Sequence, residues 1–204
     1  PGDASPVLEI LQKENINLQT ILITHKHADH IGGVKELIKA YPNVKICGPK
    51  NNFNFVCKEV DDDDLVVIDV LNISFRVIAT PGHTLDHIVF ADENHLFCGD
   101  TIFGCGCGRL FEGTFSQMHT SLNILSKLPR SIKIFCAHEY TKKNIEFALM
   151  IEKNNEALIA RKKSLIGVDI TLPSTLSEEL KTNPFLRSKN LAQFKERRIR
   201  KDNF

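Results

Sequence analysis

Thr24-His25-Lys26-His27-Ala28-Asp29-His30 is the stretch of this sequence that decides the fold. It brings three imidazoles and one carboxylate into six consecutive residues, directly after the apolar run 20–23. Zinc, iron and manganese all accept imidazole and carboxylate ligands. A single tetrahedral site would need fewer ligands from one loop, so the spacing predicts two neighbouring metal ions. Two such ions indicate hydrolysis by a metal-bound hydroxide.

Three more candidate ligands follow strand-like segments elsewhere in the sequence. His83, Asp100 and His138 each come just after an apolar run. Sheets of open α/β type place ligands beyond the C-terminal ends of their strands. Any one of the three, taken alone, would be read equally well as a turn with an incidental polar residue. Their recurrence after the first cluster favours one shared site.

A workable assignment divides seven side chains between two metals. One metal takes His25, His27 and His83, the other takes Asp29, His30 and His138, and Asp100 bridges the two. Asp29 and Asp100 are the candidate catalytic residues. His87 is near enough in sequence to orient a ligand. His95 and His119 receive no role.

The order of apolar and polar residues predicts a mixed α/β region followed by a helical tail. Expected helices cover 6–15, 31–41 and 116–128, and expected strands cover 20–23, 44–47, 65–80, 87–91, 95–98 and 132–136. The segment 51–64 is polar and predicts irregular structure, with a solvated acidic turn at 61–64. After residue 140 the pattern becomes helical. We therefore expect domains at 1–140 and 141–204.

Composition narrows the class of protein. The chain has 204 residues, 42% hydrophobic and 25% charged, with a formal net charge of +1. These values are ordinary for a globular protein and predict no general affinity for nucleic acid. No apolar run is long enough to span a membrane. Six cysteines without a C-x-x-C pair favour reduced thiols and a cytoplasmic location. Because the chain opens without Met, a mitochondrial or other organelle location stays open as an alternative.

The combined motifs resemble the metallo-β-lactamase superfamily. The resemblance lies in 24–30 with Gly32-Gly33, in Gly82-His83-Thr84, in Gly99-Asp100-Thr101 and in His138. Three longer strings resemble the glyoxalase II (hydroxyacylglutathione hydrolase) family more closely. They are GCGRLFEGT at 106–114, HEYT at 138–141 and NPFLR at 183–187.

This resemblance implies an αββα sandwich that lacks its first N-terminal strands here, followed by a small helical domain. The implied reaction is hydrolysis of S-(2-hydroxyacyl)glutathione, such as S-D-lactoylglutathione, to glutathione and D-lactate, the second step of methylglyoxal detoxification. The implied cofactors are two divalent metal ions, zinc first, with iron or manganese as alternatives. The implied partner is the small-molecule thioester, with no membrane, no nucleic acid and a monomeric chain. The implied substrate-binding residues are Arg109, Phe111, His138, Tyr140, Arg198 and Lys201.

Three departures from the family pattern accompany the resemblance. The chain begins at the Pro1-Gly2-Asp3 turn, and an uncovered sheet edge there would favour instability or self-association. Phe111 stands where some relatives have Tyr, so one hydroxyl contact to substrate is absent. Asp86 stands where relatives often have Gly, beside His87.

Three other functions stay open on the sequence. The first is another enzyme of the same fold, such as a mono-iron persulfide dioxygenase. The second is a truncated, inactive chain, although all seven ligand positions are filled. The third is nuclease activity or nucleic-acid binding through the basic cluster at 195–201, which steep salt dependence would reveal.

Overall fold

The computed structural model describes residues 1–51, 53–55 and 57–204. Eight α-helices are described: α1 (Ser5–Lys13), α2 (Ala28–Ile31), α3 (Val34–Ala40), α4 (Phe115–Leu125), α5 (Thr141–Ile151), α6 (Glu156–Ser164), α7 (Leu176–Thr182) and α8 (Leu191–Asp202). A 3-10 helix, η1 (Asp69–Leu71), divides the expected strand 65–80 in two. Among these residues, no helix is long and apolar enough to cross a membrane.

The described strands form a three-stranded sheet, a six-stranded sheet and one two-stranded hairpin. The smaller sheet is parallel, in the order β1 (Thr20–Leu22), β2 (Lys45–Pro49), β3 (Lys58–Val60). The larger one has the order β11 (Ser174–Thr175), β10 (Lys133–Cys136), β7 (His95–Gly99), β6 (Ile88–Ala91), β5 (Ile73–Ala79), β4 (Leu65–Ile68). Its strands are antiparallel except for β10 and β7. The hairpin pairs β8 (Ile102–Phe103) with β9 (Gly106–Cys107).

The two sheets pack face to face through one apolar cluster. Phe75 and Val77 of β5 and Phe90 of β6 meet Cys47 of β2 and Val60 of β3. The intervening residues Ile78 and Val89 belong instead to the core beneath the tail helices. This period of two follows from the pleat, which turns successive side chains to opposite faces.

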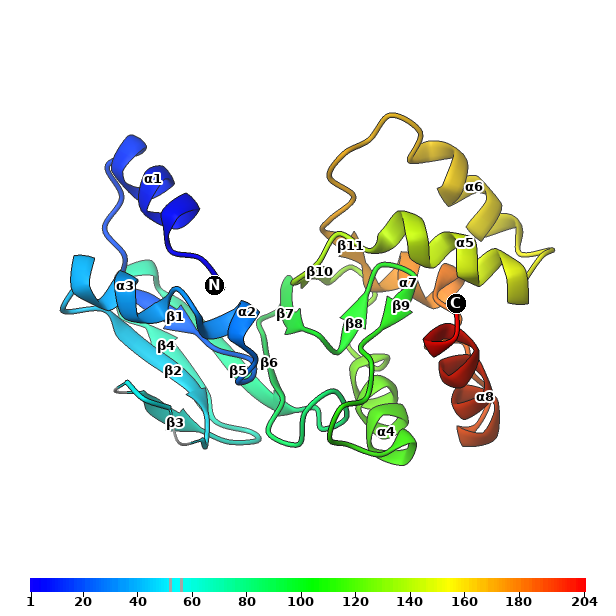
Figure 1. The fold of residues 1–204 in the computed structure, drawn as a ribbon, viewed down its shortest axis with the longest axis horizontal. Coiled ribbons are helices and arrows are strands. Elements are labelled where there is room, and N and C mark those ends of the chain that lie inside the picture. The colour runs from blue at the N-terminus through cyan, green and yellow to red at the C-terminus, as the bar shows by residue number, and fades with distance from the viewer. Residues whose placement is uncertain (52, 56) are drawn as a thin grey trace.

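Helices cover both outer faces, as Figure 1 shows. Val34 and Leu37 of α3 pack with Ile21 and Ile46 of the smaller sheet. Met118 of α4 and helices of the tail pack on the larger sheet. The layers therefore run helix, sheet, sheet, helix, which confirms the predicted αββα sandwich with its helical tail.

Helix starts agree with local capping chemistry. Thr114 and Gln117 form a reciprocal capping box, so α4 begins at Phe115. The side chains of Asn155, Thr175 and Asn190 cap α6, α7 and α8. These polar caps satisfy backbone N–H groups that a helix cannot bond internally.

Several expected elements differ in the structure. The expected helix 31–41 is replaced by α2 and α3, with Gly32 and Gly33 between them. A Cβ on Gly33 would lie 2.5 Å from the backbone nitrogen of Ala4, so glycine allows the start of the chain to pack there. The expectation of irregular structure over 51–64 was wrong for β3, and β8, β9 and β11 were not predicted. Each of these strands has three residues or fewer, too short to show periodicity.

Replacing Phe90 should test the contact between the two sheets. Phe90 is fully buried, so Phe90→Ala removes a large side chain and should lower the free energy of unfolding by about 3–5 kcal/mol. Val67 on β4 is half-exposed, and Val67→Ala should change it by no more than about 0.5 kcal/mol. Urea denaturation measures both values, and equal losses would contradict this packing.

Candidate metal centre

The His-rich stretch lies between β1 and α2, where the chain leaves the smaller sheet. His25 and His27 precede α2, and Asp29 and His30 lie in its single turn. His83 comes from the loop after β5, Asp100 from the end of β7 and His138 from the end of β10. The structure thus brings the seven predicted ligand side chains to one edge of the sandwich.

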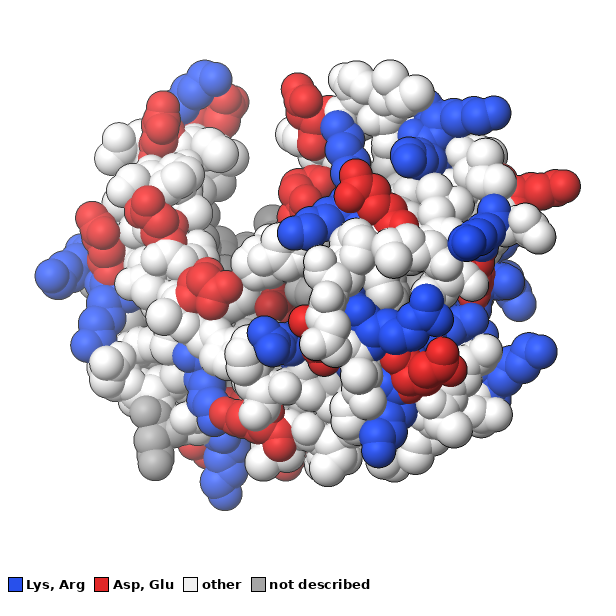
Figure 2. Space-filling model, turned by 45° about the vertical axis from the view of Figure 1, so that its right-hand side comes forward, with Lys and Arg blue, Asp and Glu red and all other residues white. Residues whose placement is uncertain are grey.

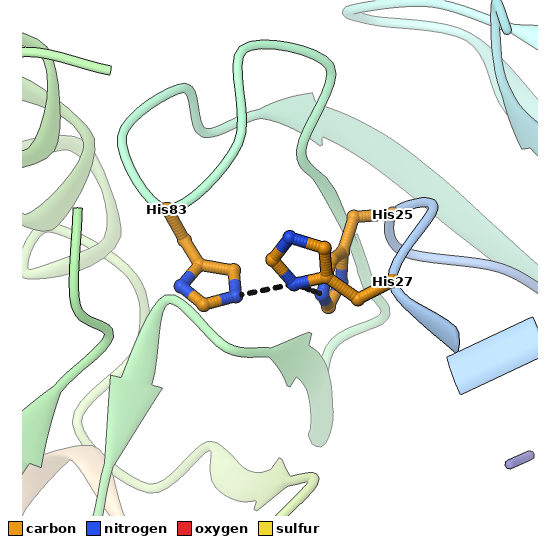
Figure 3. Close-up of side chains that lie close together, drawn as sticks. All are labelled: His25, His27 and His83. Atoms are coloured by element: carbon orange, nitrogen blue, oxygen red, sulfur yellow. Dashed lines mark hydrogen bonds between the residues drawn. The ribbon is translucent and has the colours of Figure 1, made fainter. Parts of the chain in front are cut away.

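Three ring nitrogens converge in the first group. His25 Nε2 lies 3.2 Å from His27 Nδ1, and His83 Nε2 lies 3.0 Å from the same atom. Figure 3 shows His83 approaching from the opposite side to His25 and His27. His25 and His83 are buried, whereas His27 is partly accessible. These three nitrogens are close enough to hold one metal ion.

A second group adjoins the first through Asp100. Asp29 Oδ2 lies 3.4 Å from His30 Nε2 and 3.3 Å from His138 Nε2. Asp100 Oδ1 lies 3.3 Å from His30 Nε2 and 3.6 Å from His138 Nε2. The other oxygen of Asp100 lies 3.3 Å from His83 Nε2. Asp100 therefore faces both groups at once, as a bridging carboxylate must.

Outer hydrogen bonds orient the rings. His83 Nδ1 donates to the carbonyl oxygen of Arg109 at 2.7 Å, and His25 Nδ1 is hydrogen-bonded to Thr24 Oγ1 at 3.1 Å. His87 Nε2 accepts from the backbone N–H of Asp100 at 3.2 Å, in line with its expected orienting role. Such bonds fix ring position and tautomer at metal sites.

The protonation states suit metal binding. Burial, followed by the neighbouring histidines, holds the pKa of His25 far below its ordinary value. Burial also lowers the pKa of His83, and it lowers that of His87 to about 3. Burial alone would raise the pKa of Asp100, but His30 and other histidines outweigh it and lower that pKa. Neutral imidazole and ionised carboxylate are the forms that bind metals.

Two buried atoms of the cluster lack hydrogen bonds. His30 Nε2 and Asp100 Oδ1 are buried, and neither has a hydrogen-bond partner among the described residues. They lie 3.3 Å apart, but their geometry makes no hydrogen bond. Buried polar atoms are normally satisfied. The donor set and these two atoms therefore fit a bound divalent metal ion.

Aromatic rings stand beside the candidate ligands. Phe111 lies edge-on to His27 and His83, with ring centroids 5.3 Å and 5.2 Å away. Tyr140 stacks on His138 at 4.9 Å. Both rings are exposed, Phe111 at 63% and Tyr140 at 48%. They present apolar surface to solvent beside the cluster.

The predicted carboxylate-binding cations lie further along the same loop and on α8. Arg109 Cζ lies 5.9 Å from the Phe111 ring centroid, and its Nε lies 3.8 Å from Asp202 Oδ1. Arg198 is buried, and its guanidinium donates to Asp202 Oδ1 and to the Cys107 carbonyl, both at 2.9 Å. Lys201 Nζ lies over aromatic rings of the tail. Arg109 is thus open to solvent, whereas Arg198 is already engaged within the protein.

A cavity of about 400 Å³ adjoins the second group. Asp29, His30 and His138 line it together with Leu22 and Phe135. On the face drawn in Figure 2 the surface is hollowed between the two halves of the molecule. Acidic and basic side chains are interspersed on that face, without the continuous basic stripe that nucleic-acid binding favours.

An ion pair that the sequence patterns did not predict joins two site loops. Lys26 Nζ lies 2.8 Å from Glu112 Oε1, and Glu112 Oε2 accepts from the backbone N–H of Leu85 at 3.0 Å. Lys26 stands between two predicted ligands, and Glu112 belongs to the string at 106–114. The position of Glu112 in that string was the available signal, although the string alone could not reveal the partner.

Comparison with known proteins places the chain in a family. Residues 1–138 match the family model described as metallo-beta-lactamase superfamily, and residues 139–204 match the one described as hydroxyacylglutathione hydrolase C-terminus. A hydroxyacylglutathione hydrolase of Pseudoalteromonas translucida is 48% identical over 193 residues, which are 92% of this chain and 74% of that protein. One from Vibrio campbellii is 46% identical over 93% of this chain and 77% of its own length.

Solved structures agree on the fold. ETHE1 from Myxococcus xanthus has a TM-score of 0.72 at 24% identity, over 96% of this chain and 75% of its own. TTHA1623 in a di-iron-bound form has a TM-score of 0.65 at 21% identity, over 91% and 86%. Because identities this low show the fold alone, the finer assignment rests on the curated relatives and on both family models. The chain belongs to the hydroxyacylglutathione hydrolase family of the metallo-β-lactamase superfamily.

Proposed function

We propose that this chain hydrolyses S-(2-hydroxyacyl)glutathione thioesters such as S-D-lactoylglutathione, giving glutathione and D-lactate. The observation that carries the proposal is the convergence of seven imidazole and carboxylate side chains beside the exposed rings of Phe111 and Tyr140. The name of the relatives supports the substrate class. The product pair corresponds to the second step of methylglyoxal detoxification.

Two divalent ions fit the cluster, with zinc, iron and manganese as the candidates. His25, His27 and His83 would hold one ion, and Asp29, His30 and His138 the other, with Asp100 shared. Bound there, such ions lower the pKa of water towards neutrality and polarise a carbonyl oxygen. The pairing of ligands is supported by the spacing of their donor atoms.

Asp29 and Asp100 have different tasks in this proposal. Asp100 is buried and contacts both ligand groups, one through His30 and the other through His83. Asp29 has a side chain 58% exposed, so it can meet solvent and orient the attacking water. The leaving group is a thiolate, whose parent thiol has a pKa of about 8.5. Its departure needs no strong general acid.

The substrate's glutathione part needs cations for its carboxylates. Arg109, Arg198 and Lys201 supply them in this proposal, and the buried Nε–H of Arg198 has no partner among the described residues. Phe111, Tyr140 and His138 would contact the thioester end. The arrangement is supported by the contacts that lead from the cluster through Phe111 to Arg109.

The two parts of the chain have different tasks in this proposal. Residues 1–140 act as the catalytic domain and 141–204 as the substrate-binding domain, in a monomeric chain with a small-molecule partner. The six cysteines are free, which supports a cytoplasmic location, since disulfides are rare there.

Metal-loaded chain should hydrolyse S-D-lactoylglutathione with two metal ions bound per chain. His83→Ala removes a predicted ligand and should cost roughly a hundredfold or more in turnover, since even outer contacts cost 10–100-fold. Metal analysis and thioester cleavage measure both. A folded, two-metal preparation without turnover would overturn the proposal, and one iron with oxygen-dependent persulfide consumption would favour the dioxygenase alternative.

Phe111→Tyr should improve binding of the thioester. The added hydroxyl can restore a contact that some relatives make, and one hydrogen bond contributes about 0.5–1.5 kcal/mol, roughly two- to tenfold in KM. Steady-state kinetics compares the variant with the parent. An unchanged KM would show that the hydroxyl of this ring does not reach the substrate.

The pH dependence of KM should follow Lys201. Burial, followed by the cationic neighbours Arg198 and Lys143, lowers the pKa of Lys201 to about 8. Below this pH the ammonium is charged and attracts a carboxylate, and above it the charge is lost, so KM should rise between pH 7 and 9. In Lys201→Arg the charge persists, and KM should stay flat. A rise of equal size in both proteins would contradict the assignment.

A further inference from the structure

The hairpin beside the metal centre is held by side chains from the helical tail. Each residue from 103 to 107 has a backbone group that is hydrogen-bonded to a buried tail side chain. The side-chain amide of Asn183 donates to the carbonyls of Phe103 and Gly106, at 3.2 Å and 2.8 Å. The carbonyl of Gly104 accepts from Asn144, and that of Cys107 accepts from Arg198, both at 2.9 Å. The N–H of Cys105 donates to Glu179 at 2.8 Å. The partners are 40 to 91 residues apart in sequence.

The hairpin cannot hold this position alone. β8 and β9 pair at only two positions, Ile102 with Cys107 and Phe103 with Gly106. Isolated two-stranded hairpins are marginally stable in water. Cys105 at the turn has a φ of +54°, which is uncommon for a residue with a side chain. External hydrogen bonds must therefore fix the loop.

Glu179 is the centre of this network. Its side chain is fully buried on α7. Oε2 accepts from the Cys105 N–H and lies 3.1 Å from Asn183 Nδ2, while Oε1 lies 2.8 Å from Arg161 Nη2. Arg161, buried on α6, also donates to Thr182 Oγ1 at 2.7 Å. The ion pair offsets the cost of burying a carboxylate.

The loop leads directly to the first ligand group. A Cβ on Gly108 would collide with the carbonyl oxygen of Asp100. The next carbonyl, that of Arg109, accepts the Nδ1–H of His83 at 2.7 Å. A carbonyl oxygen can only accept, so this contact keeps the proton on Nδ1 and turns the lone pair of Nε2 toward His27.

We propose that Glu179, with Asn183, is a positioning residue for the metal ligand His83. These tail side chains hold the backbone of 103–107 in position. That backbone in turn positions the carbonyl of Arg109, which accepts from His83 and so determines its tautomer. The inference rests on the metal site proposed above. The helical tail thus supports the first metal site as well as the substrate.

A matched pair of double variants of the full chain tests the role of the Glu179 oxygen that accepts from the Cys105 N–H. Arg161→Met with Glu179→Gln removes both buried charges but keeps an oxygen for the Cys105 N–H. Arg161→Met with Glu179→Leu removes the same charges and the oxygen. Apo protein is titrated with Co²⁺ against a chelator, and the visible absorption of bound Co²⁺ reports each site.

The Gln variant should bind two Co²⁺ ions as the parent does. The Leu variant should lose about 10–100-fold in affinity at one site only, the loss typical of a missing outer contact. Equal binding by the two folded variants, or equal weakening of both sites, would overturn the proposal. Absence of thioester cleavage by the parent would instead count against the proposed substrate and leave this readout intact.

A measurement on the parent decides the matter if the Leu variant does not fold. In Zn²⁺-loaded, ¹⁵N-labelled chain, NMR of His83 should find the proton on Nδ1, exchanging slowly with water because Arg109 accepts it. A proton on Nε2, or a freely exchanging one on Nδ1, would break the link from tail to ligand and overturn the proposal.

Discussion

The structure depends on holding several lone pairs close together in a buried place. The ring nitrogens of His25, His27 and His83 lie within 3.2 Å of a neighbour, and a carboxylate of Asp100 faces them. Free side chains would not stay in this arrangement, and rigid attachments to the protein hold them there. Gly99 allows one of them, since a Cβ there would lie 2.5 Å from Thr24 Oγ1.

The sandwich supplies that rigidity. Ligands leave the ends of β1, β7 and β10, strands buried by a second sheet or by helices on both faces. Packed cores of this kind move little, so each ligand enters the site from a fixed direction. The tail adds to this frame, because β11 pairs with β10 directly before the His138 turn.

Much of this could be predicted from the sequence, and the misses have a common cause. The long apolar runs and the alternation in 73–79 predicted strands correctly, because a strand buried on one or both faces has a recognisable pattern of apolar residues. The strands β8, β9 and β11 have two residues each, and partners elsewhere in the chain create them. Likewise the string NPFLR marked the family, but it did not reveal that Asn183 bonds the backbone of Phe103 and Gly106.

The sequence by itself determined the set of ligand types, their grouping at strand ends and the family to which they point. These are properties of residue identity and short spacing, since imidazole and carboxylate groups are metal ligands by their own chemistry. Only the tertiary structure decided that Asp100 faces both groups, that Arg198 is buried and that Glu179 reaches Cys105. Hydrogen bonds between residues so far apart depend on how the layers pack, and no local pattern encodes that packing.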